Sequence, residues 1–232
     1  MTPSGPGENE ARLADEVARS SAHLYSGIVE WYVQRFFDDL EDADWLDTLV
    51  RRLPPSSLIL DVGAGPGNFA RFLARNGCTT ISSDIAVEMV RASQVLVPEC
   101  PTVVADMRSL PFRGESFDGI LCAYSLMHIP AGATPGVLAE FTRMLRPAGV
   151  LQLMIKTGSG AYQFRSGLVE DARGFVQLWE LEEFLSLVEE SGCSIEDVQK
   201  KQPSSPHEFD YPKVMILASA NGRRVRESPY PA

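Results

Sequence analysis

The sequence predicts an α/β fold with a doubly wound, mostly parallel sheet that is covered by helices on both faces, in three layers. Short apolar runs of strand length alternate with segments of helical periodicity along most of the chain. One run, Leu58 to Leu60, is continuously apolar, as expected for a strand buried on both faces of a parallel sheet. The chain has 232 residues, of which 44% are hydrophobic and 22% charged, and this composition suits one domain with a substantial core.

Helices are expected before the sheet, over residues 11–53. A second helix of this region is predicted from Asp44 to Arg52, because the following prolines cannot continue a helix. These helices either pack on the sheet edge or cover a ligand site as a lid, and the sequence leaves both interpretations open. The first helix is indicated by apolar residues at helical spacing, namely Leu24, Ile28, Trp31, Tyr32 and Phe36.

A glycine-rich turn follows the Leu58 to Leu60 strand. Asp61 comes directly after the strand, and apolar residues at helical spacing begin at Phe69, so the segment predicts strand, tight turn and helix. Glycines permit positive φ and close approach of the main chain to a ligand, and the helix points unpaired N–H groups at that ligand. This arrangement is typical of a nucleotide-binding turn. Its glycines are Gly63, Gly65 and Gly67.

The details of the turn disfavour two common nucleotide motifs. A dinucleotide fingerprint needs a third glycine where this chain has Asn68, and no Lys followed by Ser or Thr completes a P-loop. A carboxylate at Asp61 would also repel a pyrophosphate and favour a cationic or hydroxyl-bearing ligand. An NAD-dependent oxidoreductase is kept as an alternative.

Two further strands are predicted to end in carboxylates. Residues 79–82 are β-branched enough for a strand, and Asp84 follows the turn by about the twenty residues expected for the acidic group that takes ribose hydroxyls. Asp84 is also interpretable as a helix cap. Residues 102–105 form a third short strand that leads to Asp106 and Met107.

The second half of the chain continues the alternation. We expect strands over residues 119–123, 150–155 and 214–218. Helices are expected over the ranges 137–145 and 181–188. Residues 157–177 begin with a glycine- and serine-containing stretch after a strand end, so we expect a flexible loop that serves as a candidate substrate lid.

Four ordered motifs between Leu58 and Lys156 resemble those of class I S-adenosylmethionine-dependent methyltransferases. They are D-V-G-A-G-P-G from Asp61, F-D at Phe117, S-L-M-H-I from Ser125, and L-R-P-A-G from Leu145. The resemblance implies a Rossmann-like methyltransferase fold with seven strands, the last antiparallel, and S-adenosylmethionine as cofactor.

This resemblance implies domain boundaries and a cofactor site. Residues 54–220 are the expected catalytic domain, residues 1–10 are expected to be disordered, and residues 221–232 to form a flexible tail. Asp61 and the glycines would seat the methionine portion, Asp84 the ribose, and Asp106 with Met107 the adenine, although Asp106 is also interpretable as a surface turn. The implied cofactor residues are Asp61, Gly63, Ala64, Gly65, Gly67, Asp84, Ile85, Met89, Asp106, Met107 and Ala123.

The strand end around His128 bears on the acceptor. The S-L-M-H-I stretch resembles metal-independent, mostly small-molecule methyltransferases, and the proline-containing and carboxylate-rich motifs of other acceptor classes are missing there. Cys122 is expected to pack within its strand rather than act as a nucleophile. His128 is the candidate general base because its ordinary pKa lies near neutrality, with a structural role as the alternative. The candidate substrate-binding residues are Tyr25, Trp31, Tyr32, Tyr124 and Tyr162.

Composition narrows the partners. The four cysteines include no C-x-x-C pair, so neither a disulfide framework nor a zinc site is expected. A net charge of -10 disfavours nucleic acid, and no apolar run approaches the roughly 20 residues needed to span a bilayer. We therefore expect a cytoplasmic methyltransferase that acts on oxygen, nitrogen or carbon of a small molecule without a metal. A protein that binds S-adenosylmethionine without methylating is the main alternative, and the oligomeric state is left open.

Overall fold

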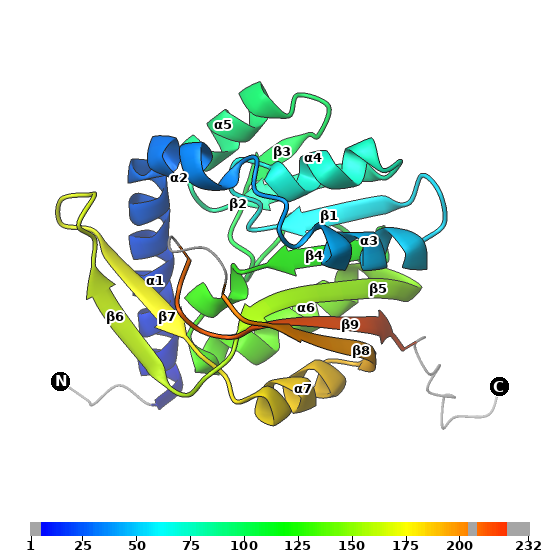
Figure 1. Cartoon of the computed structure of the whole chain (residues 1–232). Coiled ribbons are helices and arrows are strands. Elements are labelled where there is room, and N and C mark those ends of the chain that lie inside the picture. The colour runs from blue at the N-terminus through cyan, green and yellow to red at the C-terminus, as the bar shows by residue number, and fades with distance from the viewer. Residues whose placement is uncertain (1–5, 204–207, 222–232) are drawn as a thin grey trace.

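The computed structural model of the chain describes residues 6–203 and 208–221 and confirms the predicted seven-stranded, mostly parallel sheet (Figure 1). The strand order is β3-β2-β1-β4-β5-β9-β8, and β9 is antiparallel to both of its neighbours. The strands are β1 (Leu58–Val62), β2 (Thr79–Asp84), β3 (Thr102–Val104), β4 (Phe117–Ala123), β5 (Leu145–Lys156), β6 (Ala161–Arg165), β7 (Arg173–Gln177), β8 (Cys193–Lys201) and β9 (Lys213–Ala220). The α-helices are α1 (Pro6–Gly27), α2 (Val29–Phe36), α3 (Ala43–Arg52), α4 (Asn68–Arg75), α5 (Val87–Leu96), α6 (Thr134–Met144) and α7 (Leu181–Glu190), and two short 3-10 helices are η1 (Leu126–His128) and η2 (Ala131–Ala133).

Helices cover both faces of the sheet, which gives the expected three layers. Helices α3, α4 and α5 lie on one face, and α6 and α7 lie on the other (Figure 1). On the first face, Trp45 and Leu49 of α3 pack with Leu121 of β4 in one buried cluster. On the opposite face, Phe141 of α6 and Phe184 of α7 belong to a second buried cluster. Because the central strands contribute apolar side chains to both clusters, they read as continuous apolar runs in the sequence.

The carboxyl ends of β1 and β4 form the topological switch point of the sheet. Strand β1 pairs in parallel with β2 on one side and with β4 on the other. The chain runs outward through β2 to β3 and then returns to β4, so the crossovers diverge between β1 and β4. Ligands of open α/β sheets bind at this point. Helices α1 and α2 and the β6–β7 hairpin gather at the same end of the parallel strands (Figure 1).

The N-terminal region differs from the expectation in two respects. Residues 6–10 belong to α1, so the disorder expected for residues 1–10 is wrong for this part, and residues 1–5 lie outside the described range. The single helix expected over Leu24 to Phe36 is broken into α1 and α2 at Ile28, whose φ of -103° and ψ of 8° are not helical. The break lets α2 change direction beside the sheet edge (Figure 1). Of the expected tail, residues 222–232 also lie outside the described residues.

Residues 157–177 are a hairpin rather than the expected flexible loop. Strands β6 and β7 pair antiparallel, with Tyr162 opposite Val176 and Phe164 opposite Gly174. The inward-facing aromatic residues alternate with exposed ones along β6, and this period-2 pattern is the strand signal that the surrounding glycines and serines obscure. Strand β8 was also not predicted, because its charged sequence is that of an edge strand, which pairs on one side only.

Truncation of Leu49 tests the α3 side of the core. Leu49 is 0% exposed, whereas Leu40, before α3, is 45% exposed. We expect Leu49→Ala to lower the free energy of unfolding by about 2–5 kcal/mol, because it removes buried methyl groups and leaves a cavity. Leu40→Ala is the matched control and should stay within about 0.5 kcal/mol of wild type. Urea denaturation measures both, and equal effects would contradict this packing.

Candidate functional site

Backbone hydrogen bonds to β2 and close packing against Ser125 hold the glycine turn after β1 in place. The N–H groups of Gly63 and Ala64 both donate to the carbonyl of Ser83, at 2.8 and 3.0 Å. Gly63 has φ of 68°, and a Cβ atom there would lie 1.8 Å from Oγ of Ser125. Glycine is therefore required at position 63 both by conformation and by close approach. The turn brings the end of β1 against the residues that follow β4.

Asp84 fastens this turn to the next helix. Its Oδ2 accepts a hydrogen bond from Gly65 N–H at 2.8 Å, and its Oδ1 accepts one from Ala86 N–H at 2.8 Å. Burial raises the pKa of Asp84, and the backbone bonds act in the opposite direction. Asp84 thus holds Ala86, the residue before α5, but no side chain caps α5, so the helix-cap interpretation is not confirmed. The two backbone bonds do not exclude the expected ribose contact, because each carboxylate oxygen has a second lone pair and Asp84 lines a cavity.

Asp61 is a buried carboxylate with an unused acceptor. It is 1% exposed, and its Oδ2 has no hydrogen-bond partner among the described residues. Burial, together with the neighbouring charge of Asp84, raises the pKa of Asp61 to about 7. A buried polar atom without a partner is costly, so the arrangement suits a ligand that brings a positive charge or a donor to this oxygen.

Two adjoining cavities lie at the switch point. The smaller, of about 80 Å³, is bounded by most of the predicted cofactor residues, and the larger has a volume of about 390 Å³. Residues that line the smaller cavity include Gly63, Gly65, Asp84, Ile85, Met89, Asp106, Met107 and Ala123. Ala64 and Asp61 line the larger cavity, and Gly67 lines neither of the two. Six residues line both cavities and define their junction: Tyr25, Tyr32, Gly63, Ala123, Tyr124 and His128.

Asp106 lines the smaller cavity and also accepts hydrogen bonds from Arg108. Its carboxylate forms two bonds with Nε of Arg108 at 3.0 and 3.1 Å and a third with Nη2 at 2.7 Å. Arg108 also donates to Asp15 of α1 at 2.9 Å. Asp106 thus links the loop after β3 to the N-terminal helix, and the predicted contact of Asp106 with adenine stays a prediction.

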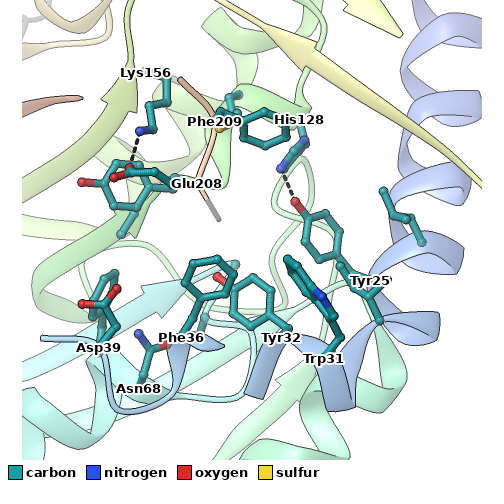
Figure 2. Close-up of a pocket in the computed structure, with 18 of the residues that line it drawn as sticks. Tyr25, Trp31, Tyr32, Phe36, Asp39, Asn68, His128, Lys156, Glu208 and Phe209 are labelled. Atoms are coloured by element: carbon teal, nitrogen blue, oxygen red, sulfur yellow. Dashed lines mark hydrogen bonds and ion pairs between the residues drawn. The ribbon is translucent and has the colours of Figure 1, made fainter. Parts of the chain in front are cut away.

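The larger cavity has one aromatic wall and one charged wall. Trp31, Tyr32 and Phe36 of α2 form one side, and Lys156 and Glu208 lie across the cavity from them (Figure 2). Of the predicted substrate-binding residues, the structure brings Tyr25, Trp31, Tyr32 and Tyr124 to this cavity. Tyr162 is not among its lining residues; its ring packs 6.2 Å from that of Tyr211.

The charged wall was not found by sequence reasoning. Lys156 and Lys213 pair across β5 and β9, and their side chains are 3% and 2% exposed. Lys156 Nζ bonds to the Glu208 carboxylate and donates to the Tyr211 carbonyl at 3.2 Å. Lys213 Nζ lies 3.3 Å from Asp42 Oδ1. A lysine directly after an apolar strand, as at Lys156, was the available signal.

Tyr124 follows β4 in an unusual conformation. Its φ is 54°, a left-handed value that is uncommon for a residue with a side chain. The conformation is held from both ends, because Tyr124 N–H donates to the Met154 carbonyl at 2.7 Å and its hydroxyl donates to Asp42 Oδ2 at 2.6 Å. Strained backbone of this kind concentrates at functional sites. Tyr124 turns the chain so that η1 and His128 face the cavity junction.

His128 is hydrogen-bonded through both ring nitrogens. Nδ1 lies 2.7 Å from the carbonyl oxygen of Phe175, and Nε2 lies 2.7 Å from the hydroxyl of Tyr25 (Figure 2). A carbonyl only accepts, so Nδ1 carries the proton and Nε2 accepts the Tyr25 hydroxyl proton in the neutral ring. Burial lowers the pKa of His128, and the bond to Phe175 acts in the opposite direction. The ring is therefore neutral near pH 7.

Comparison with known proteins identifies the family. Residues 60–153, which span β1 to β5 and the glycine turn, match the family model described as a methyltransferase domain. Residues 60–153 therefore form a methyltransferase domain of the class I S-adenosylmethionine-dependent type. The family cofactor is S-adenosylmethionine, and the nicotinamide alternative is set aside.

Individual relatives are distant. Methyltransferase GfsG of Streptomyces halstedii is 29% identical over 175 residues, which cover 64% of this chain and 62% of that protein. The structure of 1,6-didemethyltoxoflavin-N1-methyltransferase from Burkholderia thailandensis has a TM-score of 0.67 at 18% identity and covers 95% of this chain and 92% of that one. The [4+2]-cyclase SpnF has a TM-score of 0.62 at 16% identity, covering 77% and 80%. The chain spans 40 to 62% of the length of the curated relatives named methyltransferase GfsG and uncharacterized protein Rv1405c, so its match to whole proteins is partial.

The residues present fit S-adenosylmethionine. The unpaired Oδ2 of Asp61 suits the ammonium of the methionine portion. Gly65 borders the smaller cavity, and a Cβ atom there would meet only Tyr32, at 3.8 Å, so the missing side chain leaves room for a ligand. Asp84, Met89 and Met107 border the smaller cavity, where ribose and adenine are expected. Within residues 6–203 and 208–221, no cluster of three or more metal-ligating side chains occurs, and no helix is long and apolar enough to cross a bilayer.

Gly63→Ala should prevent cofactor binding. The new Cβ would clash with Ser125, and φ of 68° would strain any side chain. Gly77→Ala is the matched control, because Gly77 also has positive φ (87°) but a Cβ atom added there would meet nothing within 4 Å. We expect calorimetry to detect no S-adenosylhomocysteine binding for Gly63→Ala and near-wild-type affinity for Gly77→Ala. Binding by both variants would contradict the assignment of the turn.

Asp61 should make cofactor affinity depend on pH. With a pKa of about 7 in the free protein, Asp61 is partly protonated below that pH, whereas a bound ammonium favours the ionised form. Affinity for S-adenosylhomocysteine should therefore rise with pH up to about 7 and then level off. Asp61→Asn should weaken binding about 10- to 100-fold at pH 8 and abolish the pH dependence. A pH-dependent Asp61→Asn variant would show that another group is responsible.

Proposed function

We propose that this protein transfers the methyl group of S-adenosylmethionine to a small, largely aromatic acceptor without a metal ion. The observation that carries the proposal is the junction of the two cavities. The smaller cavity has the residues expected for the adenosine portion, and the larger begins at the same junction and extends under aromatic side chains. A methyl donor in the first and an acceptor in the second would meet beside Ala123, Tyr124 and His128.

The size and lining of the larger cavity support a small, flat acceptor. A volume of about 390 Å³ is at the lower end of the range for small-molecule sites. The rings of Tyr32 and Phe36 are tilted at 47° with their centroids 4.7 Å apart, and on another side the ring centroids of Phe164 and Phe209 lie 5.9 Å apart. Such rings favour a planar acceptor. The structurally similar methyltransferase from Burkholderia thailandensis binds a small molecule, 1,6-didemethyltoxoflavin, beside S-adenosylhomocysteine.

Catalysis in this arrangement is mainly positioning. Bound S-adenosylmethionine supplies an electrophilic methyl group on a sulfonium centre. Asp61 and the turn at Gly63 fix the donor, and the aromatic wall of α2 with Tyr124 fixes the acceptor and excludes water. Holding the two reactants about 3 Å apart and in line can supply a large part of the rate enhancement. The acidic side chains around the cavity, including Asp39 and Glu41, also favour a cationic donor over its neutral product.

A second function needs its own test, because a cyclase shares this fold. A protein that binds S-adenosylmethionine without transferring the methyl group needs only the cofactor residues. The larger cavity and the bonded pair of Tyr25 and His128 are not needed by a protein that only binds the cofactor, so their presence favours an enzyme with a second ligand. The labelling experiment below separates methyl transfer from another reaction on that ligand.

Methyl transfer can be tested before the acceptor is known. Protein incubated with methyl-tritiated S-adenosylmethionine and fractionated bacterial metabolite extract should place label in a small, solvent-extractable product. Addition of EDTA should leave the rate unchanged within about twofold, since no metal takes part. The Gly63→Ala variant serves as the control for label that arises without the site. Tight cofactor binding with no labelled product in any fraction would favour the non-methylating function, and loss of activity in EDTA would overturn the metal-independent mechanism.

A further inference from the structure

The position of His128 prevents direct contact between its ring nitrogens and an acceptor. Nδ1 donates to the Phe175 carbonyl of β7, and Nε2 accepts from the Tyr25 hydroxyl of α1, each at 2.7 Å. The ring of Tyr25 lies edge-on to the imidazole, with the centroids 5.2 Å apart. The imidazole therefore reaches the cavity through the Tyr25 oxygen. That oxygen keeps acceptor capacity for one more donor.

We propose that Tyr25 is the catalytic proton acceptor of the site and that His128 acts through it as the final base. The proposal rests on the methyl-transfer function above and adds the class of acceptor, one that loses a proton on methylation. Hydroxyl, acidic N–H and acidic C–H groups belong to this class, whereas tertiary amines and thioethers do not. Tyr25 and His128 both line the two cavities at their junction, where the reacting atoms meet.

The proton and electron movements balance along this chain of atoms. The electron pair that forms the bond to the methyl carbon is a lone pair of an oxygen or nitrogen acceptor, or the pair that the departing proton leaves on a carbon acceptor. The carbon–sulfur bond breaks with its electron pair left on sulfur. The acceptor proton passes to the Tyr25 oxygen as the Tyr25 proton passes to Nε2 of His128. The products are the methylated acceptor, S-adenosylhomocysteine and a histidine imidazolium that donates to Tyr25 and to the Phe175 carbonyl. The imidazolium then returns its proton to solvent.

The surroundings keep both groups in the starting protonation states. Burial lowers the pKa of His128, so the ring is neutral and able to accept a proton near pH 7. Burial, with Tyr32 of α2 and Asp84 of β2 adding smaller effects, raises the pKa of Tyr25, so its hydroxyl stays protonated and points its proton at Nε2. Tyr25 is the titratable side chain bonded to His128, and β7 presents a backbone carbonyl to it.

Other groups at the junction are less suited to this role. The Tyr124 hydroxyl already donates to Asp42, whose carboxylate lies next to Lys213. Proton transfer to Tyr124 would thus end on a carboxylate that is already paired. The Lys156 ammonium is bonded to Glu208 and the Tyr211 carbonyl at the far wall (Figure 2).

Histidine NMR tests the pair without catalysis. With nitrogen-15 histidine in the S-adenosylhomocysteine complex, we expect His128 at pH 7 to be neutral with its proton on Nδ1. Addition of 4-methylphenol should shift the Nε2 resonance, because the phenol donates to the Tyr25 oxygen. The closely related 4-methylanisole has no proton to donate and should leave it unchanged. Equal responses to the two probes, or a proton on Nε2, would overturn the proposal even if methyl transfer occurs.

Kinetics with two probe acceptors distinguish a role of Tyr25 in accepting the proton from a purely structural role. At pH 8, 4-methylphenol is un-ionised and needs a base, whereas 4-nitrophenol is largely ionised and does not. Tyr25→Phe should lower kcat/KM about 100- to 10,000-fold for 4-methylphenol, the usual contribution of a general base, and less than about tenfold for 4-nitrophenol. Equal losses with both acceptors would show that Tyr25 has only a structural role.

Substitutions at the histidine complete the test. His128→Gln offers an amide oxygen to the Tyr25 hydroxyl but takes up no proton, so it should lose as much activity with 4-methylphenol as Tyr25→Phe. A merely structural histidine would be rescued by Gln. Exposed His23 on the same helix as Tyr25 gives the control His23→Gln, which should match wild type with both probes. If the wild type binds S-adenosylhomocysteine but methylates neither phenol, the proposed function fails for this acceptor class, and the NMR result still decides the hydrogen-bond arrangement.

Discussion

Two carboxylates buried at the ends of neighbouring strands are the constraint on which the site depends. Asp84 satisfies both of its oxygens with the N–H groups of Gly65 and Ala86, and so determines the path of the glycine turn. Asp61 keeps one unpaired oxygen in a nearly sealed position. Because burying an unpaired acceptor costs free energy, the cofactor-free fold is less stable here than it would be with apolar residues, and cofactor binding offsets that cost.

The parts of the fold that could be predicted are those with local signals. The apolar run before Asp61, the glycines after it and the spacing to Asp84 indicated strand, turn and helix, and the parallel sheet followed from their alternation. Tyr162 was assigned to the substrate site because it is aromatic and belongs to the segment expected to be a lid. The structure packs its ring against that of Tyr211, and Tyr162 does not line the larger cavity. Tyr162 shares its face of β6 with Phe164, which lines the cavity. How far along the hairpin the cavity extends depends on the folded arrangement, and a loop-like composition does not reveal it.

The acceptor half of the site could be predicted only in part, since its contacts are long-range. Aromatic residues at helical spacing pointed to α2, but no local pattern shows that Lys156, Lys213 and Glu208 meet across β5, β9 and the segment before β9. The same holds for the bond between Tyr25 and His128, which joins residues 103 positions apart. His128 was recognised as a candidate base from its place after β4, but only the folded chain shows that its Nε2 is bonded to Tyr25.

The glycine turn and most of the wall of the larger cavity come from different segments of the chain, so the two can change independently. The region that matches the methyltransferase family model, residues 60–153, contains the glycine turn and the strands around it. The walls of the larger cavity come mostly from outside that region: from α1 and α2, the β6–β7 hairpin and the residues before β9. Changes in those outer segments alter the shape and charge offered to an acceptor while leaving Asp61, Gly63 and Asp84 untouched. Substitutions in the outer segments can therefore change which acceptor fits without changing the glycine turn. Tyr25 is the exception, because it belongs to an outer segment, α1, and also lines both cavities at their junction.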